Sequence, residues 1–169
     1  SAMYNPESLP TGPSFMKPPP ENAPLFTRLM AAYYMASEEY GFDLRTESGW
    51  RSVLARYWAN VTLVDRSIMK ILQALEDSGQ ADDTIVVFTS DHGEMTGDHG
   101  LLGKTVMYEE SVRVPMLIRA PMLGREQHRI SGNFSHIDLV PTIMDIMGQE
   151  VPGTMQGMSR MPVLAGKND

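Results

Sequence analysis

The chain has 169 residues, of which 42% are hydrophobic, and 14 Lys or Arg stand against 21 Asp or Glu for a net charge of −7. This length suits one globular domain of about 100 to 200 residues. Because basic residues do not cluster and no apolar run approaches about 20 residues, we expect neither a nucleic-acid partner nor a membrane span. The absence of Cys excludes disulfides and thiolate zinc sites, but it does not identify a compartment.

The first half of the chain is predicted to contain an arm and two helices. Residues 4–24 are rich in Pro and indicate an extended surface arm. Apolar side chains at helical spacing predict a helix over about 25–40, followed by a polar loop over 41–49. A longer helix is predicted over about 50–77, ending near Gly79. Its expected core-facing stripe consists of Val53, Tyr57, Val61, Val64, Ile68, Ile71, Leu72 and Leu75.

The second half is predicted to contain two strands and a helix. The apolar run 84–89 predicts a strand buried on both faces, as in a mostly parallel sheet, and 112–120 predicts a second buried strand. Residues 125–133 are expected to form a loop with an edge strand. Asp138 is expected to cap a helix that ends near Gly148. Its apolar face would comprise Val140, Ile143, Met144 and Met147. This order of elements predicts α/β architecture, with a mostly parallel sheet flanked by helices.

Residues with metal-binding and anion-binding chemistry follow the first predicted strand. Asp91 and His92 come directly after it, where ligands of α/β sheets bind. An adjacent carboxylate and imidazole can ligate a divalent cation; alternatively, Asp91 caps a turn at Gly93, and a lone His is more often structural. A glycine-rich turn then brings His99 and Lys104 toward the same place. A lysine there suits an anionic oxygen, although most lysines are solvated surface charges.

These motifs resemble those of the sulfatase family, within the alkaline phosphatase-like superfamily. The matching residues are Ser90-Asp91-His92-Gly93-Glu94, Gly97-Asp98-His99-Gly100, Gly103-Lys104, the stretch 108–115, and flanking sequence from Tyr57 to Ser159. The resemblance implies that Asp91 and His92 ligate a divalent metal, calcium first, with manganese, iron and zinc also compatible. It implies that Lys104 binds sulfate oxygens and stabilises their developing charge. His99 either acts near the leaving group or shapes the loop.

The resemblance also implies parts that this chain lacks. Sulfatases carry their nucleophile in a Cys/Ser-x-Pro-x-Arg motif, whose Cys or Ser is oxidised to formylglycine, and their paired Asp ligands lie earlier still. The chain has no Cys and no Ser-x-Pro-x-Arg. We therefore expect the second half of a catalytic domain over 25–169, preceded by a tag remnant and Pro-rich arm over 1–24. Such a piece should be inactive alone and should expose apolar surface, which favours a homo-oligomer, domain swapping or marginal stability.

Three functions are compatible with this pattern. The leading one is a sulfuric ester hydrolase acting on a small sulfate ester or a sulfated glycan. A phosphonate monoester or phosphodiester hydrolase of the same superfamily would present the same metal ligands and lysine. A third is a non-catalytic interaction module. Residues near the site that we expect to order the structure rather than to catalyse are Glu94, Asp98, Tyr108, Glu109, Arg113, His136 and Asp138.

Overall fold

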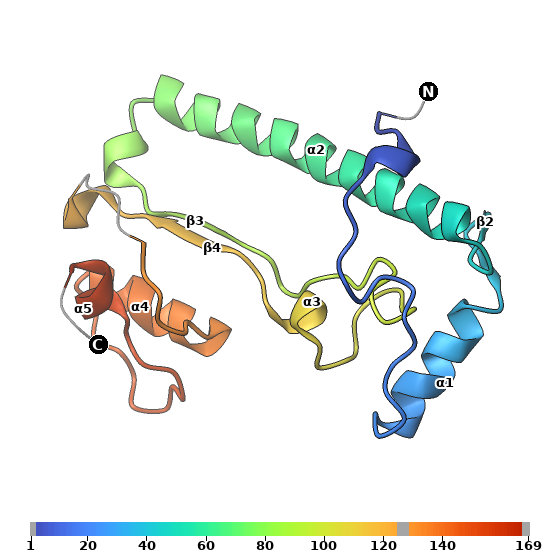
Figure 1. Cartoon of the computed structure of the whole chain (residues 1–169). Coiled ribbons are helices and arrows are strands. Elements are labelled where there is room, and N and C mark those ends of the chain that lie inside the picture. The colour runs from blue at the N-terminus through green and yellow to red at the C-terminus, as the bar shows by residue number, and fades with distance from the viewer. Residues whose placement is uncertain (1–2, 125–128, 167–169) are drawn as a thin grey trace. The chain divides into compact units, whose positions relative to one another are not determined.

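A computed structural model describes residues 3–124 and 129–166 (Figure 1). The chain divides into two compact units, one of Ser1–Ala74 with Thr89–Met116 and one of Leu75–Phe88 with Leu117–Asp169. The first two residues of the predicted tag remnant lie outside the described residues. The same holds for residues 125–128 of the predicted loop with an edge strand. In the described part of the chain, no helix is both long and apolar enough to cross a bilayer.

The elements follow the predicted order of helix, strand, loop, strand and helix. The α-helices are α1 (Leu25–Tyr34), α2 (Glu47–Asp77), α3 (Glu109–Val112), α4 (Leu139–Ile146) and α5 (Met161–Leu164). The strands are β1 (Glu38–Glu39), β2 (Phe42–Asp43), β3 (Val86–Thr89) and β4 (Met116–Arg119). Short 3-10 turns are η1 (Pro6–Ser8), η2 (Ala81–Asp83), η3 (Pro121–Leu123) and η4 (His136–Asp138). Residues 129–133 contain no strand, so the predicted edge strand is not seen where the structure describes this loop.

Helix α2 confirms the predicted long helix and begins slightly earlier. The Thr46 hydroxyl caps its N-terminus by accepting a hydrogen bond from Gly49 N at 3.1 Å. Gly79, with φ +71°, ends it by donating to Glu76 O at 3.0 Å. Trp50 is fully buried and donates its indole N–H to Leu44 O at 2.7 Å.

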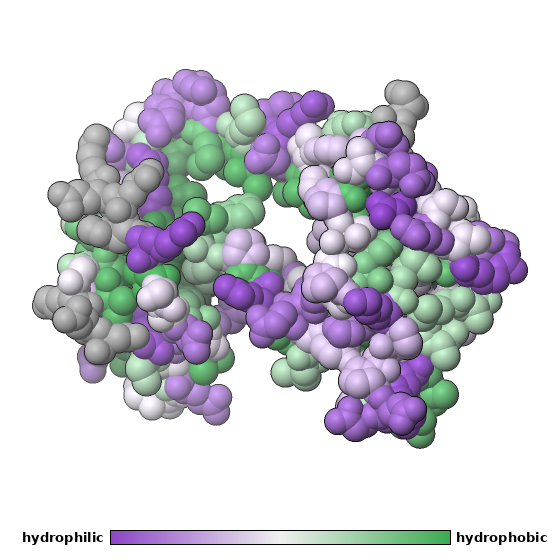
Figure 2. All heavy atoms as spheres, in the orientation of Figure 1, coloured by the Kyte–Doolittle hydropathy of each residue, from purple (hydrophilic) through white to green (hydrophobic). Residues whose placement is uncertain are grey.

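The predicted core-facing stripe of α2 is largely uncovered. Five of its members, Tyr57, Val61, Val64, Ile71 and Leu72, are exposed. Figure 2 likewise shows hydrophobic residues at the molecular surface. Apolar surface of this kind is what we expected of a partial domain, and it tends to be covered by other protein surfaces.

A hairpin replaces the end of the first predicted helix. Helix α1 stops at Tyr34, and β1 pairs antiparallel with β2, with Glu38 opposite Asp43. Tyr40 and Gly41 both have positive φ, of 53° and 81°. Two such residues make the tight turn whose twist suits a hairpin. The prediction of a helix to residue 40 was therefore wrong, and the predicted polar loop over 41–49 contains β2 and the first residues of α2.

The predicted surface arm belongs to the first unit and packs against α2. Leu9 is buried with Leu54 and Ala55 of α2, and Tyr4 packs on this cluster. The Tyr4 hydroxyl also lies 2.6 Å from Thr62 Oγ1. The segment contains the 3-10 turn η1 and further turns, and it is a packed part of the fold rather than a free surface arm.

Strands β3 and β4 form a two-stranded sheet, and the chain runs through them in opposite directions (Figure 1). The parallel pairing expected around residues 84–89 is thus not seen within the described residues. Phe88 of β3 and Leu117 of β4 are exposed, so neither strand is buried on both faces in this chain. The second strand starts at Met116 rather than near 112, because α3 takes up Glu109–Val112.

Asp138 precedes α4 but does not cap it with its side chain. Its carboxylate is buried and instead accepts hydrogen bonds from Met158 N at 3.0 Å and Arg160 Nε at 3.2 Å. These bonds, the Met158 one foremost, hold the pKa of Asp138 below its usual range. On α4, Pro141 and Thr142 are buried, whereas the predicted face residues Val140 and Met147 are exposed.

Candidate functional site

Asp91 and His92 lie in a turn that packs closely against the segment around α3. Gly93 donates its N–H to Ser111 O at 2.8 Å. A Cβ added at Gly93 would lie 1.9 Å from Glu110 O, so no other residue fits without moving the backbone. Glycine at this position therefore allows the turn after β3 to take its observed place.

The carboxylate and imidazole of the pair face each other. His92 Nε2 lies 3.3 Å from Asp91 Oδ2, and Nδ1 lies 2.8 Å from Gly93 O. Because a carbonyl oxygen only accepts, Nδ1 is assigned as the donor to Gly93 O, and Nε2 is the ring nitrogen nearest to the carboxylate. The His92 backbone N–H, which donates to Asp91 Oδ1 at 2.9 Å, lowers the pKa of Asp91 from its usual value.

This pair fits a divalent cation in chemistry and spacing. Two ligands about 2.3 Å from one ion and at right angles are about 3.3 Å apart, the separation found between these atoms. Asp91 is also open to solvent, with 82% of its side chain exposed. No cluster of three or more His, Cys, Asp or Glu suited to a metal occurs among residues 3–124 and 129–166. The chain thus brings these two candidate ligands within 3.3 Å of each other, and an ion held by them would need further ligands.

The residues from Met95 to Lys104, hereafter the lysine loop, are closed at their base. Gly103 donates its N–H to the Glu94 carboxylate, and Met95 donates to Gly103 O at 2.9 Å. The expected loop-ordering role of Glu94 agrees with this contact. Left-handed backbone recurs in and beside the loop, at Thr96, Gly97, His99, Gly100, Gly103 and Thr105.

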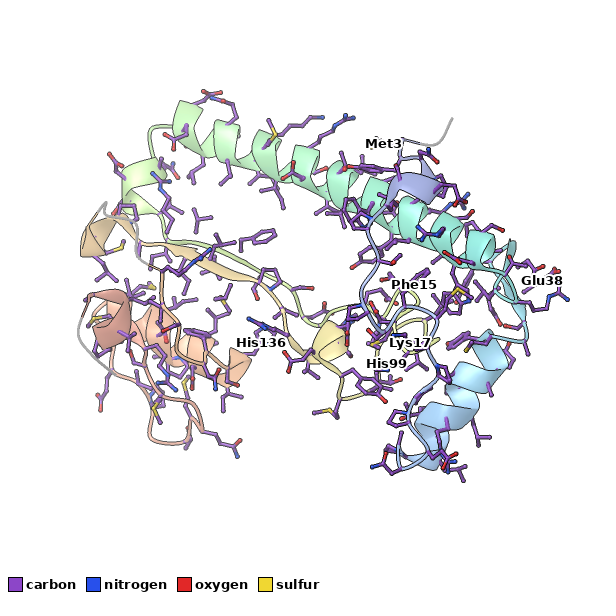
Figure 3. The ribbon with its side chains drawn as sticks, in the orientation of Figure 1. Met3, Phe15, Lys17, Glu38, His99 and His136 are labelled. Atoms are coloured by element: carbon purple, nitrogen blue, oxygen red, sulfur yellow. The ribbon has the colours of Figure 1, made fainter. Side chains whose placement is uncertain are left out.

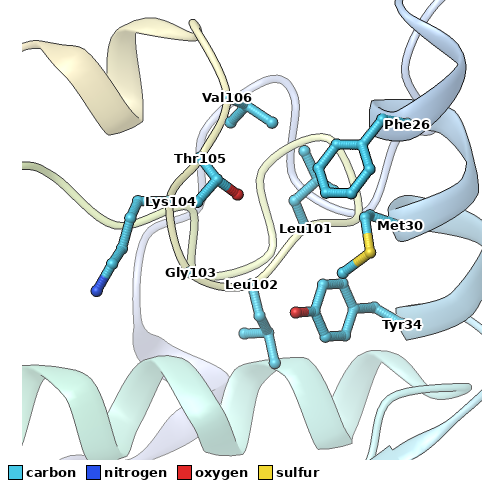
Figure 4. A pocket seen from close by; sticks show the side chains of 9 residues that line it. All are labelled: Phe26, Met30, Tyr34, Leu101, Leu102, Gly103, Lys104, Thr105 and Val106. Atoms are coloured by element: carbon cyan, nitrogen blue, oxygen red, sulfur yellow. The ribbon is translucent and has the colours of Figure 1, made fainter.

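Lys104 is the last residue of the lysine loop, and its side chain is exposed. Its ammonium forms no hydrogen bond or ion pair within the part of the chain that the structure describes. A cavity of about 240 Å³ lies between α1 and the loop, lined by Phe26, Met30, Tyr34, Leu101, Leu102, Gly103, Lys104, Thr105 and Val106. Figure 4 shows the ammonium pointing away from the other side chains of this cavity. Lys104 is therefore available to an external anion outside the apolar cavity.

His99 lies in the lysine loop with its ring against Tyr108. The two rings are stacked, with an interplanar angle of 12°. His99 N donates to Ser14 O at 2.9 Å, and in Figure 3 His99 lies near Phe15 of the arm, which forms an antiparallel bridge with Asp98. Tyr108 thus braces the loop as predicted.

The other residues expected to order this region make weaker contacts or contacts with the arm. Arg113 and Glu109 are 3.8 Å apart, but both side chains are exposed, so this pair contributes little. Asp98 accepts a hydrogen bond from the Ser14 hydroxyl at 2.6 Å. No sequence pattern pointed to Ser14, because a lone serine 84 residues before its partner belongs to no motif.

The fold is that of alkaline phosphatase-like hydrolases. The structure of the phosphonate monoester hydrolase SpPMH from Silicibacter pomeroyi superposes with a TM-score of 0.83 at 35% identity, covering 99% of this chain and 34% of that one. The phosphonate monoester hydrolase of Agrobacterium radiobacter gives 0.76 at 31% identity, with the same coverage of 99% and 34%.

The sequence model of the Sulfatase family matches residues 13–149, and the chain belongs to this family. It is 36% identical to the multifunctional alkaline phosphatase superfamily protein PehA of Trinickia caryophylli, over 97% of this chain and 33% of PehA. It is 40% identical to an N-acetylglucosamine-6-O-sulfatase of Bacteroides thetaiotaomicron, over 68% of this chain and 21% of that protein. The chain therefore spans a third or less of the relatives' length.

Proposed function

We propose that the protein containing this chain is a metal-dependent hydrolase of sulfate esters, in which this chain supplies two metal ligands and one anion-binding lysine. The observation that carries the proposal is the close approach of Asp91 Oδ2 and His92 Nε2, 3.3 Å apart, in a chain of the Sulfatase family. A carboxylate and a neutral imidazole in that arrangement suit a divalent cation.

Each residue has a defined task in this proposal. Members of the family generally use a divalent metal and formylglycine; calcium is our first candidate for the metal, with manganese, iron or zinc as alternatives. When bound, such an ion supplies a Lewis acid and a template for the ester. Asp91 and His92 would hold it, with the His92 ring oriented by Gly93 O. Lys104 would place its ammonium on an ester oxygen whose charge grows in the transition state. Formylglycine would come from a segment outside this chain.

A phosphonate monoester or phosphodiester is the second candidate substrate. Coverage favours it: PehA and the two phosphonate monoester hydrolase structures match 97% to 99% of this chain, arm included, whereas the glucosamine sulfatase matches 68%. Sulfate and phosphonate monoesters both present anionic oxygens to a cation and a lysine, so the described residues accommodate either. A sulfated glycan or a small sulfate ester remains the first candidate, because the Sulfatase family model matches residues 13–149 and identity to the glucosamine sulfatase, 40%, exceeds the 36% to PehA.

The experiment compares kcat/KM of the full-length protein on p-nitrophenyl sulfate and on p-nitrophenyl phenylphosphonate. Hydrolysis of either that is lost in Asp91→Ala supports a metal-dependent ester hydrolase, and the ratio of the two values decides the substrate class. If neither is hydrolysed although metal is bound, the proposal fails and the interaction-module alternative takes its place.

The chain alone is expected to be inactive, because no activated nucleophile is encoded in it. Turnover by purified chain that exceeds a buffer blank and disappears in Asp91→Ala would contradict this. The exposed apolar residues of α2 are consistent with self-association of the isolated chain. Light scattering of that chain across a tenfold concentration range tests for it.

A further inference from the structure

The Pro-rich arm is hydrogen-bonded to the tip of the lysine loop. Met16 N donates to Gly97 O at 2.8 Å, and His99 N donates to Ser14 O at 2.9 Å. These bonds run in both directions between two segments that are far apart in the sequence. Both segments lie in the same compact unit, so the contact belongs to one packed body.

Side chains strengthen this contact at Asp98. The Ser14 hydroxyl donates to Asp98 Oδ1 at 2.6 Å, with Glu110 Oε1 farther away at 3.4 Å. A hydroxyl has one proton, so the shorter bond to Asp98 dominates, and an ionised acceptor makes it stronger than a neutral one. Gly12 closes the other side, since a Cβ there would lie 3.0 Å from the same carboxylate oxygen.

The loop that the arm holds has a costly backbone. His99 has a φ of 54°, and Thr105, directly after Lys104, has a φ of 85°. Positive φ at a β-branched residue is a true outlier and costs about 1–3 kcal/mol, so it persists only where the surroundings enforce it. Glu94 enforces the base of the loop and Ser14 its tip. Without the contact at the tip, the loop could relax to conformations of lower energy. In those conformations Lys104 would occupy a different position.

We propose that Ser14 is a positioning residue that fixes the lysine loop through Asp98 and thereby sets the place of Lys104. Ser14 touches neither ester nor metal in this scheme and acts only through the loop. The proposal rests on the proposed function, in which Lys104 binds an oxygen of the ester.

The test is a double-mutant cycle in the full-length protein, using the better of the two p-nitrophenyl esters. Ser14→Ala should lower kcat/KM about tenfold, which corresponds to one charge-assisted hydrogen bond, and most of the loss should fall on kcat. Ser14→Thr, which keeps the hydroxyl, should restore most of it. The matched control is Ser8→Ala in the same arm, whose hydroxyl donates only locally to Asn5 O, and it should change nothing. In a Lys104→Ala background, Ser14→Ala should cause no further loss.

The possible outcomes distinguish a failure of the positioning role of Ser14 from a failure of the proposed function. An equal loss from Ser14→Ala in both backgrounds, or no loss in the wild type, overturns the positioning role while Lys104 keeps its own. Full activity of Lys104→Ala would instead refute the proposed function, and with it any action of Ser14 through that lysine. Should Ser14→Ala not fold, Asp98→Asn in the same cycle replaces it, with a partial loss expected in the wild type and none in Lys104→Ala.

Discussion

The imidazole of His99 stacks on the ring of Tyr108, with ring centroids 3.9 Å apart. The backbone of His99 is also in the left-handed region, with φ 54°, and its backbone N–H donates a hydrogen bond to Ser14 O. A residue held by its ring and by its backbone is suited to shaping a loop. Of the two roles that the sequence left open for His99, this geometry favours loop shape over proton donation to a leaving group.

Replacing His99 by Phe should separate these roles, because Phe retains the stacked ring but has no titratable nitrogen. We expect kcat/KM of the full-length protein to fall less than about tenfold, whereas loss of a general acid typically costs 10²–10⁴-fold. His99→Asn tolerates the backbone but lacks the ring, and it should lower thermal stability by about 0.5–1.5 kcal/mol. A fall of kcat/KM beyond about 100-fold in His99→Phe, with stability intact, would instead assign proton transfer to His99.

Lys104→Ala in the full-length protein should lower kcat/KM by about 10²–10³-fold, the usual effect of losing one donor to a developing oxyanion. Lys104→Arg should recover part of it, because a planar guanidinium does not replace a compact ammonium. Metal content should hardly change. Lys70→Ala, on the exposed surface of α2, is the matched control. Near-wild-type kcat/KM in Lys104→Ala would show that the lysine is a solvated loop charge.

Metal binding should depend on residues beyond this chain. With two ligands supplied, titration of the chain with calcium or manganese ions should show no saturable binding tighter than about 1 mM by calorimetry. In the full-length protein, Asp91→Ala and His92→Ala should each lower the metal content measured by mass spectrometry, with activity lost in parallel. Tight stoichiometric binding by the chain alone would contradict the incomplete site.

Acid should weaken the second unit through Asp138. Because the pKa of this carboxyl is lowered in the folded state, its contribution is fully present above the unfolded value of about 3.9. That contribution is lost as pH falls through the lower folded pKa, when Asp138 protonates and releases Met158 N and Arg160.

Asp138→Asn should lower the free energy of unfolding at pH 7 by about 1–3 kcal/mol and flatten its decline below about pH 4. Urea denaturation at pH 7 and pH 3.5 measures both effects. Asp65→Asn, an exposed site on α2, is the control and should leave the pH dependence unchanged. An unaltered acid slope in Asp138→Asn would assign that slope to other carboxylates.

Local sequence was sufficient for the long helix, the positions of the two strands and the contact between Asp91 and His92. Helical spacing from Trp50 to Asp77 and the stop at Gly79 are short-range signals, and α2 follows them closely. Asp91 and His92 are adjacent in the chain, so their contact was predictable from the sequence. The family motifs supplied the functional interpretation, because an Asp-His-Gly sequence alone is weak evidence for a metal site.

The tertiary structure decided whatever depends on residues far apart in the chain. The sequence marked the arm as Pro-rich and extended, but its bonds from Ser14 and Met16 to the lysine loop join segments that no periodicity connects. Likewise, Asp138 had the chemistry of a helix cap, yet the nearby backbone of Met158 and the guanidinium of Arg160 took its carboxylate instead. A residue's own chemistry states what it can bind, and packing alone determines which partner comes within hydrogen-bond distance.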